Sequence, residues 1–167
     1  MLNRRGICTT LLLVVITAAT AFAQGGKLKK AKDYMEALDY IEAIKVYQQV
    51  LQSDDNSEAK INISECYRKV NDSENAEYWY GQVVRLPEVQ PVHKLYYGMM
   101  LQINGKCDLA KEWYDQFTKE VPEDVRGQYL VKACEYEEVL MTKNAGIFEI
   151  AHMPFNSNLD DHSPAIF

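Results

Sequence analysis

One eight-residue phrase occurs three times in this chain, and its spacing constrains the fold more than any other feature. The copies are AIKVYQQV (43–50), AEYWYGQV (76–83) and AKEWYDQF (110–117). They begin 33 residues apart (from 43 to 76) and then 34 residues apart (from 76 to 110). A near-constant period of this length is typical of stacked structural repeats, so we expect three similar units.

The residues that the copies share fall on one face of an α-helix. In the second copy they are Ala76, Trp79, Tyr80 and Val83, at offsets of 0, 3, 4 and 7. Such offsets bring side chains together along a helix, whereas a strand would mark every second residue. We expect the alanine to allow close approach of another helix and the aromatic residues to fill the space between helices.

A second phrase precedes each copy, and it predicts another helix. Its copies are AKDYMEAL (31–38), SECYRKVN (64–71) and GMMLQING (98–105). Each starts with a small residue, twelve residues before the later alanine. Every unit is therefore predicted to be a helix, a tight turn and an antiparallel helix. Asn71-Asp72-Ser73 offers an N-cap at the second turn, and Asn104-Gly105 offers a residue that tolerates a positive φ at the third.

This pattern resembles the tetratricopeptide repeat over residues 25–122. The third unit matches best, in Tyr97, Gly98, Leu101, Gly105, Ala110, Tyr114, Phe117 and Pro122. The first two units carry Leu38 and Asn71 where the family prefers glycine. The resemblance implies an all-α, right-handed solenoid of three helical hairpins.

A further helix is predicted after the third unit, over residues 124–141, as a cap on the exposed end of the solenoid. Its expected apolar stripe consists of Leu130, Ala133, Cys134 and Met141. Glu135, Glu137 and Glu138 are expected to face solvent. The solenoid with its cap is thus predicted to span residues 24–142.

Both ends of the chain differ from the repeats. Residues 1–23 carry two arginines, an apolar run and the sequence Ala-Phe-Ala, which together predict a secretory signal peptide cut before Gln24. The alternative is a membrane anchor over residues 6–23. Residues 143–167 lose the helical pattern, with short apolar segments at 147–150 and 165–167 that could be strands. We expect a linker and the start of a β-propeller there.

Three cysteines, Cys66, Cys107 and Cys134, remain after the predicted cleavage. An odd number leaves at least one thiol unpaired within the chain. The favoured interpretation is three small buried residues without a bridge. If one disulfide forms, Cys107 with Cys134 is the expected pair, since their helices would be neighbours.

The composition argues against several function classes. Removing the predicted signal peptide leaves 18 − 2 = 16 basic residues against 24 acidic ones, a net charge of −8 that disfavours nucleic acid as a partner. His93, His152 and His162 lack metal-ligand spacing, and His93 is expected to be exposed at a helix start. No phosphate-binding loop or Gly-x-Ser-x-Gly sequence occurs. We therefore predict no catalysis, no metal and no cofactor.

The repeat family places the first helices of its units along a concave groove, which identifies the candidate binding residues. Carried over by register, they are Leu28, Lys32, Met35, Ile61, Glu65, Arg68, Leu95, Met99 and Gln102, with Tyr129 on the cap. Such a mixed row suits an extended peptide or a helix of a partner protein. Leu28 and Lys32 occupy positions of the family's carboxylate clamp, so binding of chaperone tails is not expected. An inert spacer is the alternative.

The order of parts is similar to that of PorE-like proteins of the OmpA family, which are secreted envelope proteins of Bacteroidetes. FNSNLDDHSPAIF (155–167) resembles the first propeller strand of that family, and RGQYLVKACEYEE (126–138) the helix before it. The resemblance implies a truncated periplasmic scaffold at the outer membrane, in a type IX secretion assembly. It would reach peptidoglycan only through absent downstream sequence. The alternatives are a module that positions a downstream carbohydrate-binding or enzymatic domain, and a secreted enzyme whose active site lies beyond Phe167.

Overall fold

The computed structural model describes residues 25–87, 89–143 and 146–147, and all of its regular structure is helical within these ranges. A first helix covers residues 25–36. It is followed by α2 (Tyr40–Leu51), α3 (Ser57–Lys69), α4 (Ser73–Val83), α5 (Pro91–Ile103), α6 (Cys107–Glu120) and α7 (Arg126–Lys143). The predicted signal peptide and the segments expected to form strands from residue 148 onward lie outside the described residues. None of the described helices is long and apolar enough to cross a membrane.

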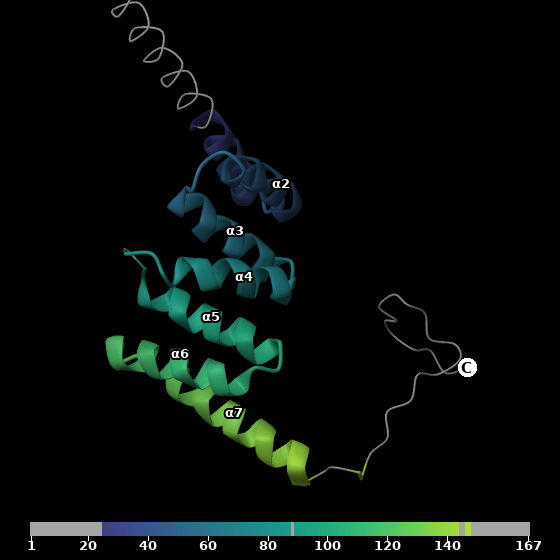
Figure 1. Cartoon of the computed structure of the whole chain (residues 1–167), viewed down its shortest axis with the longest axis vertical. Coiled ribbons are helices and arrows are strands. Elements are labelled where there is room, and N and C mark those ends of the chain that lie inside the picture. The colour runs from purple at the N-terminus through teal and green to yellow at the C-terminus, as the bar shows by residue number, and fades with distance from the viewer. Residues whose placement is uncertain (1–24, 88, 144–145, 148–167) are drawn as a thin grey trace, which may run out of the picture. The chain divides into compact units, whose positions relative to one another are not determined.

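The helices form three hairpins, as the repeated phrases predict. From α2 to α6, each helix packs against the next one along the chain (Figure 1). The chain divides by its internal contacts after Cys134, so α7 belongs to the first unit up to that residue and to the second from Glu135. The fold class is therefore an all-α solenoid, as predicted.

The shared positions of the repeated phrase form the core. Tyr47, Tyr80 and Tyr114 are exposed by only 0%, 1% and 0% of their surface. The alanines that begin the three phrases are fully buried. One cluster of buried residues lies under the first two hairpins, and a second joins the third hairpin to the start of α7. The core thus repeats with the sequence period, because each helix is covered by its neighbours.

The start of α7 covers the third hairpin, but with a stripe different from the predicted one. Ala133 is exposed, whereas Gly127, Leu130, Val131 and Cys134 face the second cluster or are buried. The side chain of Met141 lies outside the description. Gly127 sets the rotation of the helix: a Cβ atom there would lie 2.2 Å from Thr118 Oγ1. The stripe therefore runs from position 127 at offsets of 3, 4 and 7.

The three turns within the hairpins share one backbone geometry. Leu38, Asn71 and Gly105 have φ angles of 62°, 59° and 73°, in the left-handed region. After each of them the backbone N–H donates across the turn to the first helix, as Asp39 N does to Tyr34 O at 2.9 Å. This is the Schellman closure, which favours glycine at the left-handed position. The family's preference for glycine at this turn thus has a backbone cause.

Replacing Leu38 with glycine is expected to raise the free energy of unfolding by up to about 1 kcal/mol. A leucine pays about 1–2 kcal/mol for the left-handed conformation, and the greater freedom of an unfolded glycine offsets part of that gain. The Leu38 side chain is 70% exposed, so little packing is lost. Urea unfolding measures the change. Leu38→Ala, which keeps Cβ, serves as the control and should leave the stability unchanged.

Gly98, within α5, is required by close packing rather than by the backbone conformation of a turn. Gly98 in α5 faces Tyr114 of α6, and a Cβ atom there would lie 2.5 Å from Tyr114 Cε1. Because that ring is fully buried, it cannot move aside. Gly98→Ala is expected to lower the free energy of unfolding by about 1–3 kcal/mol.

Gly81→Ala is the matched control for this variant. Gly81 is also helical, but the contact nearest to its added Cβ is the hydroxyl of Tyr97, at 3.2 Å, at the far end of a partly exposed side chain. The gain in helix propensity, about 1 kcal/mol, should make Gly81→Ala neutral or stabilising. Equal losses for both variants in a denaturant titration would contradict the packing argument.

Candidate partner-binding surface

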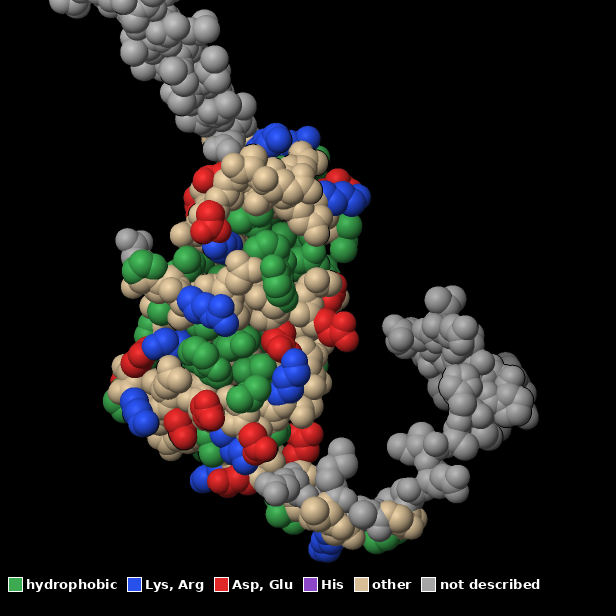
Figure 2. Space-filling view, in the orientation of Figure 1, with side chains coloured by type: hydrophobic (Ala, Val, Ile, Leu, Met, Phe, Trp, Pro, Cys, Tyr) green, Lys and Arg blue, Asp and Glu red, His purple; other side chains and the backbone are tan. Residues whose placement is uncertain are grey.

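The first helices of the three hairpins and the start of α7 carry the predicted binding residues. Most of these side chains reach the surface at least in part: Leu28, Lys32, Met35, Ile61, Glu65, Arg68, Met99 and Gln102 are half-buried, and Tyr129 is exposed. The face of the stack seen in Figure 2 carries apolar patches bordered by acidic and basic side chains. The partly exposed side chains of the row thus include both apolar and charged groups.

Leu95 is the exception, and its prediction as a groove residue is wrong. Its side chain is 1% exposed and belongs to the second core cluster. Leu95, Gly98 and Leu101 follow one another at three-residue spacing on the buried face of α5. Since Gly98 brings α5 against Tyr114, this whole stripe turns inward. Tyr96, the next residue, is partly exposed and packs against the first cluster instead.

A compact polar network lies in the middle of the row, around Glu65. Arg68 Nε donates to Glu65 Oε2 at 2.9 Å, and the Tyr80 hydroxyl donates to the same oxygen at 2.9 Å. The Arg68 guanidinium also lies 4.3 Å from the centre of the Tyr96 ring. Four side chains from α3, α4 and α5 thus hold one another in place. The repeat register predicts Glu65 and Arg68 in the row but not Tyr96.

This network fixes the charge of its members. Burial alone would raise the pKa of Glu65, but hydrogen bonds from Arg68 and Tyr80 hold it below its usual value of 4.5. Burial, with the Glu65 charge beside it, raises the pKa of Tyr80 far above its usual value. At neutral pH the carboxylate is ionised and the phenol is a neutral donor. Stability from this bond is full above pH 4.5 and is lost as the pH falls through the lowered pKa.

A pocket opens in the first part of the row, between the helix over residues 25–36 and α3. Its volume is about 400 Å³, and it is lined by Lys32, Met35, Glu36, Glu58 and Asn62. The Lys32 ammonium pairs with the Glu58 carboxylate across the two helices. Glu36, Glu58 and Asn62 were not among the predicted residues. Asn62 follows Ile61 in the sequence, so a row widened by one position on each helix would include it.

The third part of the row lies on α5, where two groups connect the surface to the core. Met99 packs against both core clusters. Gln102 accepts a hydrogen bond from the buried Tyr114 hydroxyl at 2.8 Å. At the start of the same helix, His93 is half-buried rather than exposed, and its Nδ1 accepts a hydrogen bond from the Gln90 backbone N–H at 3.3 Å. Burial lowers the pKa of His93.

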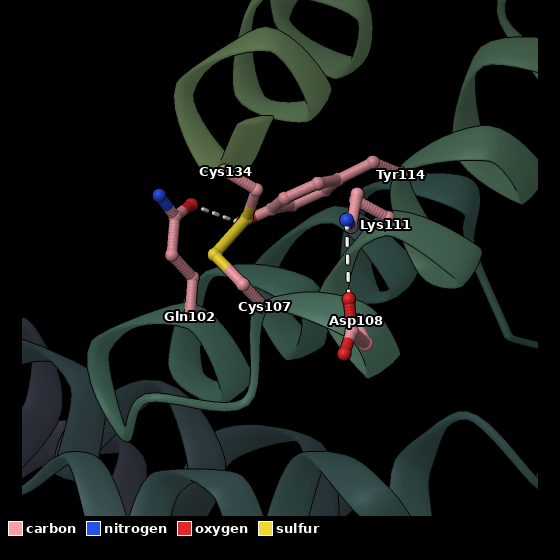
Figure 3. Close-up of a disulfide and its surroundings, with 6 residues drawn as sticks. All are labelled: Gln102, Cys107, Asp108, Lys111, Tyr114 and Cys134. Carbon is pink, nitrogen blue, oxygen red and sulfur yellow. Dashed lines mark hydrogen bonds and ion pairs between the residues drawn. A yellow bond between two sulfur atoms is a disulfide. The ribbon is translucent and has the colours of Figure 1, made fainter. Parts of the chain in front are cut away.

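The cysteines correct the favoured sequence interpretation. Cys107, the first residue of α6, forms a disulfide with Cys134 of α7, with 5.5 Å between their Cα atoms (Figure 3). This is the pair expected if a bridge formed at all. The bond closes the end of the stack beside the Tyr114–Gln102 hydrogen bond. Cys66 is a free, buried thiol, and burial raises its pKa to about 12.

No group of three or more potential metal ligands lies together among the described residues. The charged side chains of the row pair with one another instead, through Lys32 with Glu58 and Arg68 with Glu65. A ligand on this surface would therefore meet apolar side chains and paired charges.

Comparison with known proteins gives a likeness in structure. No family model matches the chain, and no curated protein matches its sequence. The first tetratricopeptide-repeat domain of Spaghetti (RPAP3), bound to the HSP90 peptide SRMEEVD, is 18% identical with a TM-score of 0.60, over 70% of this chain and 93% of that one. The Yersinia enterocolitica type III secretion chaperone SycD, in complex with a peptide of the translocator YopD, is 14% identical with a TM-score of 0.59. That match covers 68% of this chain and 93% of SycD.

A third structure, the second tetratricopeptide-repeat domain of human RPAP3 with the HSP70 peptide SGPTIEEVD, is 18% identical with a TM-score of 0.57. It covers 65% of this chain and 92% of its own. The TM-scores show a common fold, and at identities this low the likeness extends to the fold alone. The chain is therefore an all-α tetratricopeptide-repeat solenoid.

Proposed function

We propose that this protein is a non-catalytic scaffold that binds a segment of a partner protein through the first helices of its hairpins. The observation that carries the proposal is the row of partly exposed side chains on these helices, from Leu28 to Gln102. Similar structures hold peptides of HSP90, HSP70 and YopD. A solenoid presents such a row as one extended surface, which suits an extended or helical segment.

The test is capture of binding proteins by variants of the row. Ile61→Asp combined with Met99→Asp places two charges on the surface, and we expect at least a tenfold loss of captured partner. Leu109→Asp is the matched control, because Leu109 is 49% exposed on α6, a second helix of its hairpin. Circular dichroism should show unchanged helicity in all variants. Equal capture by the double variant and by Leu109→Asp would show that the partner binds elsewhere than on the first helices.

Arg68 is unsuited to this test. Reversing its charge would break the bonds to Glu65 and leave that half-buried carboxylate beside another one. Such a change destabilises the fold as well as any interface.

We further propose that the scaffold works in the periplasm, at the outer membrane, in an assembly such as the type IX secretion machinery. Two observations support this location: the signal-peptide pattern of residues 1–23 and the disulfide between Cys107 and Cys134. Disulfides persist in oxidising compartments and are rare in the cytosol. Fractionation of cells that express the tagged chain, with thiol labelling of each fraction, tests the proposal. A cytosolic pool with both cysteines labelled would contradict it.

A further inference from the structure

We propose that the partner segment is apolar with a basic side chain, and that the surface rejects acidic peptide tails. This inference rests on the proposed function and specifies its ligand. It follows from the ion pairs that the charged side chains of the row form within the chain.

The two cations of the row, Lys32 and Arg68, both pair with carboxylates of the chain, as two neighbouring lysines also do. Lys32 pairs with Glu58, and Lys29 lies 2.8 Å from Asp33. A third carboxylate, that of Glu65, serves two cations. Arg68 donates to it, and Lys69 lies 3.8 Å from it.

Arg68 is also immobilised by stacking. Its guanidinium lies over the Tyr96 ring, and its side chain is only 21% exposed. An acidic ligand would have to draw Arg68 away from both Glu65 and the ring. Removing one partner of such a half-buried pair is costly, because the remaining charge stays poorly solvated. The row therefore lacks a cation that an incoming carboxylate could take without breaking a bond.

The groups that remain for a ligand are apolar. Leu28, Met35 and Met99 are partly buried against the core cluster, and Ile61 is half-exposed between them in the register. Methionine adapts its shape to different apolar partners, since its side chain is unbranched and polarisable. These four side chains suit a segment with several apolar residues.

The pocket beside Met35 supplies the electrostatic preference. Its lining holds one cation, Lys32, and two carboxylates, Glu36 and Glu58. One negative charge therefore exceeds the internal pair. The volume of about 400 Å³ accommodates one long side chain. A lysine or arginine of the partner complements this charge, whereas an aspartate or glutamate would be repelled.

The experiment is a selection with a phage-displayed library of random peptides on the full chain with its disulfide formed. Peptides that also bind the Ile61→Asp, Met99→Asp variant are removed, so that only peptides that bind the row remain. We expect enrichment of aliphatic residues and methionine together with lysine or arginine, and depletion of aspartate and glutamate. The selected peptides should bind Leu109→Asp as they bind the parent chain.

Two direct measurements complete the test. Glu58→Lys should lower the affinity for the best selected peptide by at least about tenfold, which corresponds to about 1.4 kcal/mol of binding free energy. The acidic peptide SRMEEVD should show no binding at concentrations that saturate the selected one. Enrichment of acidic peptides, or binding of SRMEEVD, would overturn this inference and leave the proposed function standing. A selection without any peptide that depends on Ile61 and Met99 would overturn both.

Discussion

Replacing Tyr80 with alanine is expected to lower the free energy of unfolding by about 3–5 kcal/mol, the usual cost of deleting a large buried aromatic side chain. Tyr80 is 1% exposed and fills the space between α3, α4 and α5. Its hydroxyl also donates to Glu65, so the variant leaves that carboxylate with fewer donors in a half-buried site. A domain of this size has a total stability of only about 5–15 kcal/mol, so much of the margin disappears.

Tyr78→Ala is the control for this variant, because Tyr78 lies two residues away on the same helix and is 61% exposed. It should change stability by no more than about 0.5 kcal/mol. Tyr80→Phe separates the two contributions of the side chain, since it removes the hydroxyl and keeps the ring. We expect an intermediate loss of about 1–3 kcal/mol for it. Urea unfolding followed by circular dichroism measures all three, and similar losses for Tyr78→Ala and Tyr80→Ala would refute the assigned core.

Removing the disulfide is expected to cost about 3–4 kcal/mol. Cys107 and Cys134 are 27 residues apart, and a bridge of that span restricts the unfolded chain by about this amount. The double variant Cys107→Ser, Cys134→Ser removes the bond. It should also loosen the start of α7, which packs on the third hairpin through Leu130 and Val131. Hydrogen exchange should then show faster exchange in residues 126–134 than in α3.

Addition of a reductant provides the control for the disulfide. The parent chain should lose stability on reduction by about as much as the double serine variant loses, while that variant should not respond. Cys66 is buried and free, so alkylation of the folded, oxidised chain should label none of the described cysteines. If the stability of the parent chain did not change on reduction, the disulfide would contribute little to the free energy of unfolding.

The periodic part of the fold could be predicted from the sequence because its constraints are local. The alanines and tyrosines of the repeated phrase occupy the same buried places in each hairpin, as Tyr47, Tyr80 and Tyr114 show. The turns are equally local, and Leu38, which stands where the family prefers glycine, adopts the left-handed conformation. A residue's role in such a unit depends on neighbours within about 34 positions, so one sequence suffices.

The errors arise where the rotation of a helix is set by one close contact. The register predicts Leu95 on the surface, but Gly98 brings its stripe against Tyr114. The sequence predicts Ala133 in the apolar stripe of α7, but the close packing of Gly127 turns Val131 inward instead. A shift of one residue turns a side chain by about 100°, which period alone does not fix.

The candidate surface was harder still, because its character depends on pairs between helices. The bond from Tyr80 to Glu65 joins residues 15 positions apart, and the pair of Lys32 with Glu58 crosses from one hairpin to the next. A list of charged residues at the right register shows a mixed surface. Only the geometry shows that these charges neutralise one another and leave Met35 and Met99 for contact.

The concealed thiol of Cys66 bears on how the chain acquires the correct bridge. Three described cysteines allow three different pairings, and two of them would tie Cys66 of α3 to α6 or α7. Its pKa of about 12 keeps it protonated at neutral pH, and thiolates are the species that attack disulfides. Because Cys66 lies in the second hairpin, that segment can fold and shield the sulfur before Cys107 and Cys134 follow in synthesis. Burial of Cys66 thereby leaves Cys107 and Cys134 as the two described thiols that can react with each other.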